Sequence, residues 1–242
     1  AAAPAAPQEA MRRETFPVSG PLRLDLAITA GEIDVEAAPV AEAVVELESL
    51  GGPDSAVDEA RVELRGDELI VEVKKRRAEV RLRVQAPERS ALKARSASGD
   101  LRTRGPLGAV EVKTASGDVE LDEVDALEAK VASGDVEVDR VAGEARIDSA
   151  SGDVEIGETG GGATVRTASG DQLVRSVAQG RVDLTSASGD IRLGIKQGSR
   201  LWIDARSMSG DVSSELELGD EVDTEEEGPL VEAQVTAMSG EV

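Results

Sequence analysis

The chain has 242 residues, with one Trp, one Phe and no Tyr, Cys or His. Its 27 Lys and Arg against 49 Asp and Glu give a formal net charge of −22. Such a surface repels phosphates, so we expect neither nucleic acid nor an anionic membrane as a partner. The missing His removes the commonest general base and zinc ligand. No apolar run reaches the roughly 18 residues of a membrane-spanning helix, so no direct membrane insertion is expected.

Residues 1–14 begin with AAAPAAPQEA, which is rich in Ala and Pro and predicts a flexible segment. This start is similar to the one left after a signal peptide has been removed, or to a spacer. The alternative is a cytosolic protein with a low-complexity tail. We expect an exported protein, extracellular or on the cell surface, whose signal peptide has already been removed.

Residues 15–97 contain several runs in which apolar and polar residues alternate, such as LRLDLAI and EIDVEA. Alternation with a period of two predicts half-buried strands. The stretch GGPDSAVDEA interrupts these runs and predicts a loop, and TAGEIDV places Glu32 where later turns carry Asp. We expect irregular β layers that cap the rest of the chain and form one folded unit with it.

Residues 98–242 repeat the turn phrase SGD seven times, with 18, 17, 18, 18, 19 and 21 residues between successive aspartates. Gly accepts a positive φ and Asp can bond nearby backbone groups, so the phrase suits a tight corner between strands. The predicted turn ladder consists of Gly99, Asp100, Gly117, Asp118, Gly134, Asp135, Gly152, Asp153, Gly170, Asp171, Gly189, Asp190, Gly210 and Asp211. An eighth copy, MSGEV, has Glu241 in the Asp place.

Two short alternating segments lie between successive turns. Aliphatic residues follow each turn, as at Val119 and Leu121, and others precede it, as at Ala145 and Ile147. A fixed period of this length predicts a solenoid. We therefore expect an all-β fold, a β-helix-like parallel β-solenoid with two-strand coils of about 18 residues stacked about 4.8 Å apart. Its thin core would be aliphatic, which explains the scarcity of aromatic residues.

The last part of the chain departs from the regular repeat. Residues 213–228, SSELELGDEVDTEEEG, predict an acidic insertion that widens the last coil. One interpretation of the strand-like segment after it is an open end that joins the next chain head to tail, giving filaments, with Leu230, Val231, Val235 and Val242 as the assembly end. The alternative is a monomer whose end is covered by the acidic insertion. Trp202 falls in an outward phase and is either a contact residue or shielded by the insertion.

Polar residues also interrupt the predicted core. Gln172 stands in an aliphatic column and predicts a bulge or a shifted register. Thr114 and Thr167 belong to a column that alternation points inward, so we interpret them as core residues and not as an exposed threonine array.

The seven turn aspartates would repel one another unless they are hydrogen-bonded or neutralised by cations. One interpretation is a calcium-binding edge, and the other is a corner whose carboxylates accept backbone N–H bonds. The opposite bends, such as DRVAGE and RSVAQG, lack the Gly and Asp pattern of calcium-binding rolls. We therefore favour the second interpretation and expect no metal or cofactor, with calcium as the alternative.

The SGD turns followed by Val or Ile resemble the hallmark of a bacterial and archaeal β-strand-repeat family of candidate adhesins, whose function is uncharacterised. The resemblance covers residues 15–242, including RLRVQAP before the first turn. It implies a β-solenoid in a surface or exported setting and offers no catalytic residues. We expect a non-enzymatic, adhesin-like structural protein that contacts a cell-surface or matrix component. The alternative is a cation-dependent module that binds a ligand through the Asp-lined edge or the acidic insertion.

Overall fold

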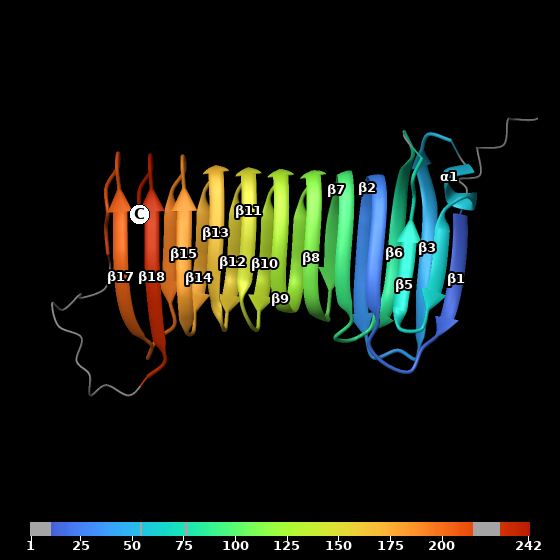
Figure 1. The fold of residues 1–242 in the computed structure, drawn as a ribbon, viewed down its shortest axis with the longest axis horizontal. Coiled ribbons are helices and arrows are strands. Elements are labelled where there is room, and N and C mark those ends of the chain that lie inside the picture. The colour runs from blue at the N-terminus through green and yellow to red at the C-terminus, as the bar shows by residue number, and fades with distance from the viewer. Residues whose placement is uncertain (1–10, 54, 76, 215–227) are drawn as a thin grey trace, which may run out of the picture.

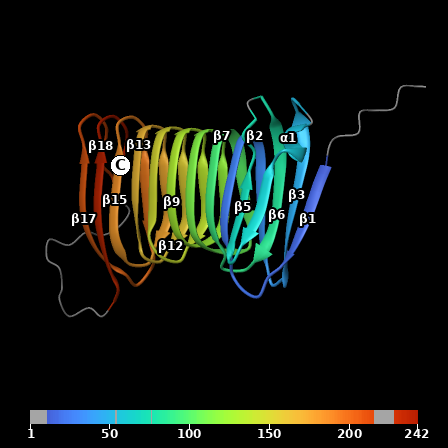
Figure 2. The ribbon, with the colours of Figure 1, turned by 45° about the vertical axis from the view of Figure 1, so that its right-hand side comes forward.

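The computed structural model describes residues 11–53, 55–75, 77–214 and 228–242, and most of them lie in strands. One helix, α1 (Ser55–Asp58), occurs among the described residues. All 18 strands belong to one hydrogen-bonded sheet that winds into an elongated body (Figures 1 and 2). The expected all-β fold is confirmed. The strands are β1 (Met11–Pro17), β2 (Arg23–Ala38), β3 (Glu42–Gly51), β4 (Arg61–Arg65), β5 (Glu68–Glu72), β6 (Glu79–Pro87), β7 (Ala91–Arg104), β8 (Pro106–Ser116), β9 (Val119–Ser133), β10 (Val136–Val141), β11 (Ala145–Ser151), β12 (Val154–Thr159), β13 (Gly162–Ser169), β14 (Gln172–Val177), β15 (Gly180–Ser186), β16 (Ile191–Ile195), β17 (Arg200–Ser207) and β18 (Leu230–Ala237).

The repeat strands pair in parallel with their equivalents in the coils before and after. Val136 lies opposite Val119 on one side and Val154 on the other, and the intervening Glu137 keeps the same register. The solenoid-like body has two faces. The groove face contains β4, β5, β8, β11, β13, β15, β18 and β17, and the back face contains β1, β3, β6, β10, β12, β14 and β16. β2, β7 and β9 run from one face to the other.

Alternate side chains of both faces fill a thin core. Val124, Val141 and Val177, which stand near the bends opposite the SGD corner, have an exposed fraction of 0%. The predicted inward residues Val119 and Leu121 are buried as well. Burying an aliphatic side chain of this size contributes roughly 1.5–3 kcal/mol. The narrow gap between the faces is therefore filled by small and branched aliphatic residues, with no need for aromatic rings.

The N-terminal end contains antiparallel strands. β1 pairs with β3, β3 with β6 and β4 with β5 in antiparallel fashion, whereas β5 and β6 pair in parallel with β2. β2 carries the imperfect turn in register with the first SGD turn, since Gly31 lies opposite Gly99 and Glu32 opposite Asp100.

Two expectations for this end need correction. β1 begins at Met11, so residues 11–14 of the predicted flexible segment 1–14 lie in a paired strand, and the first ten residues of that segment lie outside the described part of the chain. The stretch predicted as a loop contains α1, because burial of Ala56 and Val57 anchors one helical turn there.

β18 overturns the expected order of coils at the C-terminal end. It pairs in parallel with β15 on one side and with β17 on the other, so it lies inside the sheet (Figure 1). Val231 and Val235 are 0% exposed. The chain passes over one coil position after β15, and its own last strand fills that position. Alternation alone could not reveal this, because it specifies which side of a strand is buried but not which strands are its neighbours.

Candidate binding surfaces

Three surfaces of this body could serve a function: the SGD corner, a groove beside the opposite bend, and the C-terminal end. In the part of the chain that the structure describes, no group of three or more His, Cys, Asp and Glu could hold a metal ion. The described helix is also too short to cross a membrane.

The glycine of the SGD corner is required by the approach of neighbouring coils. Gly134 has a φ of 125°, and a Cβ built on it would lie 2.2 Å from the backbone oxygen of Gly117. Gly117, Gly152, Gly170, Gly189 and Gly210 share the positive φ. Gly99, in the first turn, does not have it.

The turn aspartates form a continuous hydrogen-bonded ladder. The backbone N–H of Asp118 donates to Asp100 Oδ1 over 3.0 Å. The same bond recurs along the corner at 2.8–3.0 Å, with Asp135, Asp153, Asp171 and Asp190 as successive donors. Glu241 then donates its N–H to Asp190 Oδ1 over 2.9 Å. Each of these carboxylates thus meets the N–H dipole of the next coil, which opposes the repulsion between neighbouring charges.

The order of the last turns follows from the position of β18. Glu241 stacks on Asp190, and the N–H of Val242 donates to the backbone oxygen of Asp211 over 2.9 Å. Asp211 and Gly210 therefore belong to the outermost turn, although Glu241 and Val242 come later in the sequence. Residues 215–227 of the predicted acidic insertion 213–228 lie outside the described residues.

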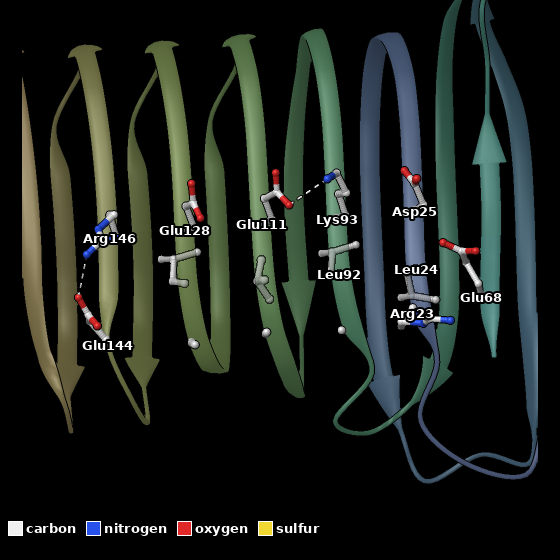
Figure 3. Close-up of a pocket in the computed structure, with 15 residues that line it drawn as sticks. Arg23, Leu24, Asp25, Glu68, Leu92, Lys93, Glu111, Glu128, Glu144 and Arg146 are labelled. Carbon is white, nitrogen blue, oxygen red and sulfur yellow. Dashed lines mark hydrogen bonds and ion pairs between the residues drawn. The ribbon is translucent and has the colours of Figure 1, made fainter.

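A groove of about 490 Å³ lies on the groove face, beside the bend opposite the SGD corner (Figure 3). Its floor is a row of small side chains, Ala91, Ala109 and Ala126, which three neighbouring strands hold in register. Along one side runs a row of charged residues at the next outward position: Asp25, Lys93, Glu111, Glu128 and Arg146. The groove therefore runs along the long axis of the body, across several coils.

Charge along this groove is arranged in exposed pairs. Lys93 Nζ lies 3.0 Å from Glu111 Oε2, and Arg146 lies 3.2 Å from Glu144 (Figure 3). Hydrogen bonds from Lys113 and from Lys93 lower the pKa of Glu111. Exposed pairs of this kind add little to stability. Their side chains can therefore exchange partners with a charged ligand at small cost.

The alanine floor was not singled out from the sequence. Ala109 and Ala126 stand in the outward phase where the next coils carry Glu144, Gly162 and Arg181. An unbroken run of small residues at an outward position is the signal that could have indicated a groove.

The third surface is the C-terminal end, which gathers exposed apolar side chains. Six large apolar residues are exposed among the described residues, and five of them lie here: Trp202, Met208, Val212, Leu230 and Met238. Trp202 is 51% exposed, in the outward phase that the sequence predicts. Of the predicted assembly end, Val231 and Val235 are buried between β15 and β17, and Leu230 begins the same interior strand. The prediction that these residues form the open end is wrong, because β17 is the outermost strand of the groove face.

Polar side chains inside the coil are satisfied only in part, because the buried Gln172 Oε1 and Ser186 Oγ have no hydrogen-bond partner among the described residues. Thr114 and Thr167 are buried, as predicted for an inward column. Gln172 is buried in regular register opposite Val154, and its Nε2 donates to Thr167 Oγ1 over 2.9 Å. The irregularity in this strand pair lies further along, between Val174 and Val177, so the prediction of a bulge at Gln172 is wrong. The Nε2 of Gln172 thus finds partners while the backbone at this residue keeps its regular register.

Two solved bacterial structures are similar in fold to this chain. One, a candidate adhesin from Parabacteroides distasonis, is 14% identical, with a TM-score of 0.56 over 96% of this chain and 97% of that protein. The other, a candidate adhesin from Parabacteroides merdae, is 10% identical, with a TM-score of 0.51 over 96% of each chain. No curated protein matches the chain significantly.

The family model described as Toastrack DUF4097 matches residues 57–241. The matched segment includes all seven SGD turns, the alanine floor of the groove and the interior strand β18. This chain belongs to the Toastrack DUF4097 family.

Proposed function

We propose that the protein is a non-enzymatic, adhesin-like scaffold, exported to the cell surface or beyond it, that holds an extended ligand in the groove of its groove face. The ligand would be a component of a cell surface or matrix. The observation that carries this proposal is the groove itself, an alanine floor beside a row of paired charges that crosses neighbouring coils in strict register. The candidate adhesins of similar fold support the surface setting.

A rigid body suits this function. Strands hydrogen-bonded on both sides hold the floor residues at a fixed spacing of about 4.8 Å, so little conformational entropy is lost when a long ligand binds. The charged row offers both signs, through Lys93 and Arg146 on one hand and Glu111 and Glu128 on the other. A ligand with an apolar spine and alternating charges or polar groups would match such a surface.

The groove can be tested by filling it. Ala109→Arg combined with Ala126→Arg places two long side chains on the floor, whereas Ala97→Arg makes the same kind of change at an exposed position outside the groove. Beads coated with each protein are measured for adhesion to immobilised peptidoglycan, bacterial polysaccharide and collagen. We expect the unaltered protein and the Ala97 variant to adhere to the same surface, and the double variant to lose adhesion. Equal adhesion by all three proteins, or no adhesion by any, contradicts the proposal.

Cation-dependent binding through the Asp-lined edge is the competing proposal. Variants of Asp135 distinguish a structural role of this edge from calcium binding. Its Oδ1 accepts the N–H of Asp153 over 2.8 Å, and an Asn side chain can keep that bond. If its role is that hydrogen bond alone, Asp135→Asn keeps stability, Asp135→Ala lowers it, and EDTA has no effect. If the edge binds calcium, millimolar calcium raises the melting temperature through binding linkage, and the Asn variant loses that rise as fully as the Ala variant.

Head-to-tail filaments need a different basis from the one that the sequence suggested. The strand expected to join the next chain lies inside the sheet, so it offers no free edge. A filament would have to join β17 to an N-terminal end where β1 and α1 lie on the outermost layer (Figure 2). Adhesion as proposed here does not depend on such a polymer.

A further inference from the structure

The C-terminal end is the part of the surface where the fold is left open. Among the described residues β17 pairs only with β18, and its inward residues Leu201, Ile203 and Ala205 are half-buried, whereas the equivalent residues of β18 are fully buried. Trp202 and Met208, at outward positions of the same stretch, are 51% and 80% exposed. An uncovered edge strand with exposed apolar side chains indicates a site for another strand.

The backbone of β17 determines which groups a new strand would meet. The N–H of Arg200 donates to Pro229 O, just before β18, and the N–H of Met208, just after β17, donates to Ala237 O at the end of β18. Backbone direction alternates along a strand, so the even-numbered residues of β17 bond β18 and the odd-numbered ones point away from it. The free amides and carbonyls therefore belong to residues 201, 203, 205 and 207.

The outward side chains of β17 match their own sequence run backwards. From Trp202 to Met208 the outward row is Trp202, Asp204, Arg206 and Met208, that is, apolar, negative, positive and apolar. If two copies pair antiparallel about Ala205, Asp204 lies opposite Arg206 of the second copy, twice by symmetry. In the same register Trp202 lies opposite Met208, again twice. Residues at non-hydrogen-bonded positions have the closest side chains in an antiparallel pair, and these outward residues occupy them.

Neighbouring registers are unfavourable by the same rule. A shift in one direction places Asp204 opposite Asp204, and a shift in the other places Arg206 opposite Arg206. Like charges that lie directly opposite each other destabilise a strand pair. The match also identifies the partner, because only a two-fold contact between identical strands requires a strand to complement itself.

We propose that the protein forms a closed two-fold dimer in which the β17 strands of two copies pair antiparallel about Ala205. The pairing joins two groove faces into one continuous sheet and covers the half-buried Leu201 and Ile203 of both copies. It places the only Trp of the chain, Trp202, inside an interface, at both ends of the paired segment, and Trp is a residue type that often dominates binding energy. A dimer of this kind is closed and does not extend into a filament.

Charge exchange provides the sharpest test. Asp204→Arg makes both charged residues of the row positive, and Arg206→Asp makes both negative. Each variant alone would therefore place like charges opposite each other in the dimer. We expect the dissociation constant of the dimer to rise at least about tenfold in each variant, as measured by sedimentation and light scattering. The two variants mixed together regain opposite charges and should form a heterodimer. The double variant, Asp204→Arg with Arg206→Asp, should dimerise as the unaltered protein does.

A backbone variant tests the same contact independently. Ala205→Pro removes an N–H that points away from β18, so the bonds within the subunit are retained while the centre of the pairing is blocked. We expect a monomer whose melting temperature equals that of the unaltered protein at concentrations low enough for both to be monomeric. The fluorescence of Trp202 should be that of a more solvent-exposed side chain. The proposal is overturned if the unaltered protein is monomeric at high concentration in moderate salt, or if it forms open polymers. It is also overturned if neither the charge-exchange variants nor the Pro variant changes the dissociation constant of the dimer.

Discussion

At the scale of single residues, the SGD corner is fixed by steric fit and by one hydrogen bond per coil. Glycine is required because the backbone oxygen of the preceding coil occupies the space of a side chain. We expect Gly134→Val to lower the free energy of unfolding by about 3 kcal/mol or more, since backbone strain at positive φ adds to the clash. Gly20→Ala is the control, because a Cβ at Gly20 would meet no atom within 4 Å and the residue has no positive φ. Chemical denaturation measures both, and a small loss at Gly134 would contradict this account of the corner.

A second residue-scale prediction concerns acid stability at the N-terminal end. Arg81 lies 2.7 Å from Glu32 and 3.1 Å from Glu48 in a half-buried cluster. The hydrogen bond from Arg81 lowers the pKa of Glu32 below its ordinary value of 4.5. A carboxyl whose folded pKa is lowered stabilises the fold above the pKa of the unfolded chain, and this stabilisation is lost as the pH falls through the folded pKa.

We therefore expect Glu32→Gln to be less stable than the unaltered protein at neutral pH and to lose less stability on acidification below about pH 4.5. Urea denaturation at a series of pH values measures the difference. Glu88→Gln is the control, because Glu88 is exposed and makes no ion pair with any described residue. A parallel pH dependence of the Glu32 variant and the unaltered protein would show that the pair contributes nothing.

At the scale of elements, β18 links β17 to the rest of the molecule. Of the strands that the structure describes, β18 alone pairs with β17, so the outermost coil can dock only after the C-terminal strand has taken its place. We expect deletion of residues 230–242 to remove hydrogen-exchange protection from β17 as well, while β10–β14 stay protected. Val235→Asp should have a similar effect, because Val235 is 0% exposed, and Gln234→Asp, at an exposed position, serves as the control. Persistent protection of β17 in the truncated chain would contradict this order.

The same strands show what could be predicted from the sequence. The inward columns, such as Val136 and Val138, follow from alternation alone, because burial of every second side chain is a local property of a strand. The groove and the place of β18 do not, because both depend on which strands lie side by side. The sequence of β18, which follows a long insertion, does not indicate between which strands it lies. Ala109 is informative only when Ala91 and Ala126 are known to be its neighbours.

At the scale of the whole molecule, negative charge is distributed unevenly along the body. The described residues up to 97 include 13 Lys and Arg against 16 Asp and Glu, and those from 98 on include 13 against 23. On the back face Glu120, Glu137 and Glu155 lie opposite one another on successive strands. Arg102 pairs with Glu120 and Arg175 with Glu155, but Glu137 makes no ion pair with any described residue. Stacking coils about 4.8 Å apart therefore brings like charges together in the repeat region.

This stacking makes stability depend on ionic strength. The screening length is about 10 Å at 0.1 M salt and about 3 Å at 1 M, so only concentrated salt screens charges on adjacent coils. We expect the melting temperature to rise between these concentrations of sodium chloride, with hydrogen-exchange protection increasing more in β9–β14 than in β1–β6. Glu137→Lys places a positive charge between two negative ones and should raise the melting temperature at low salt while reducing its salt dependence. Glu137→Gln only removes a charge, so its melting temperature at low salt should lie between those of the unaltered protein and the Lys variant. If the melting temperature instead falls with salt, attraction in pairs such as Arg81 with Glu32 outweighs repulsion along the rows, and the uneven charge is not a determinant of stability.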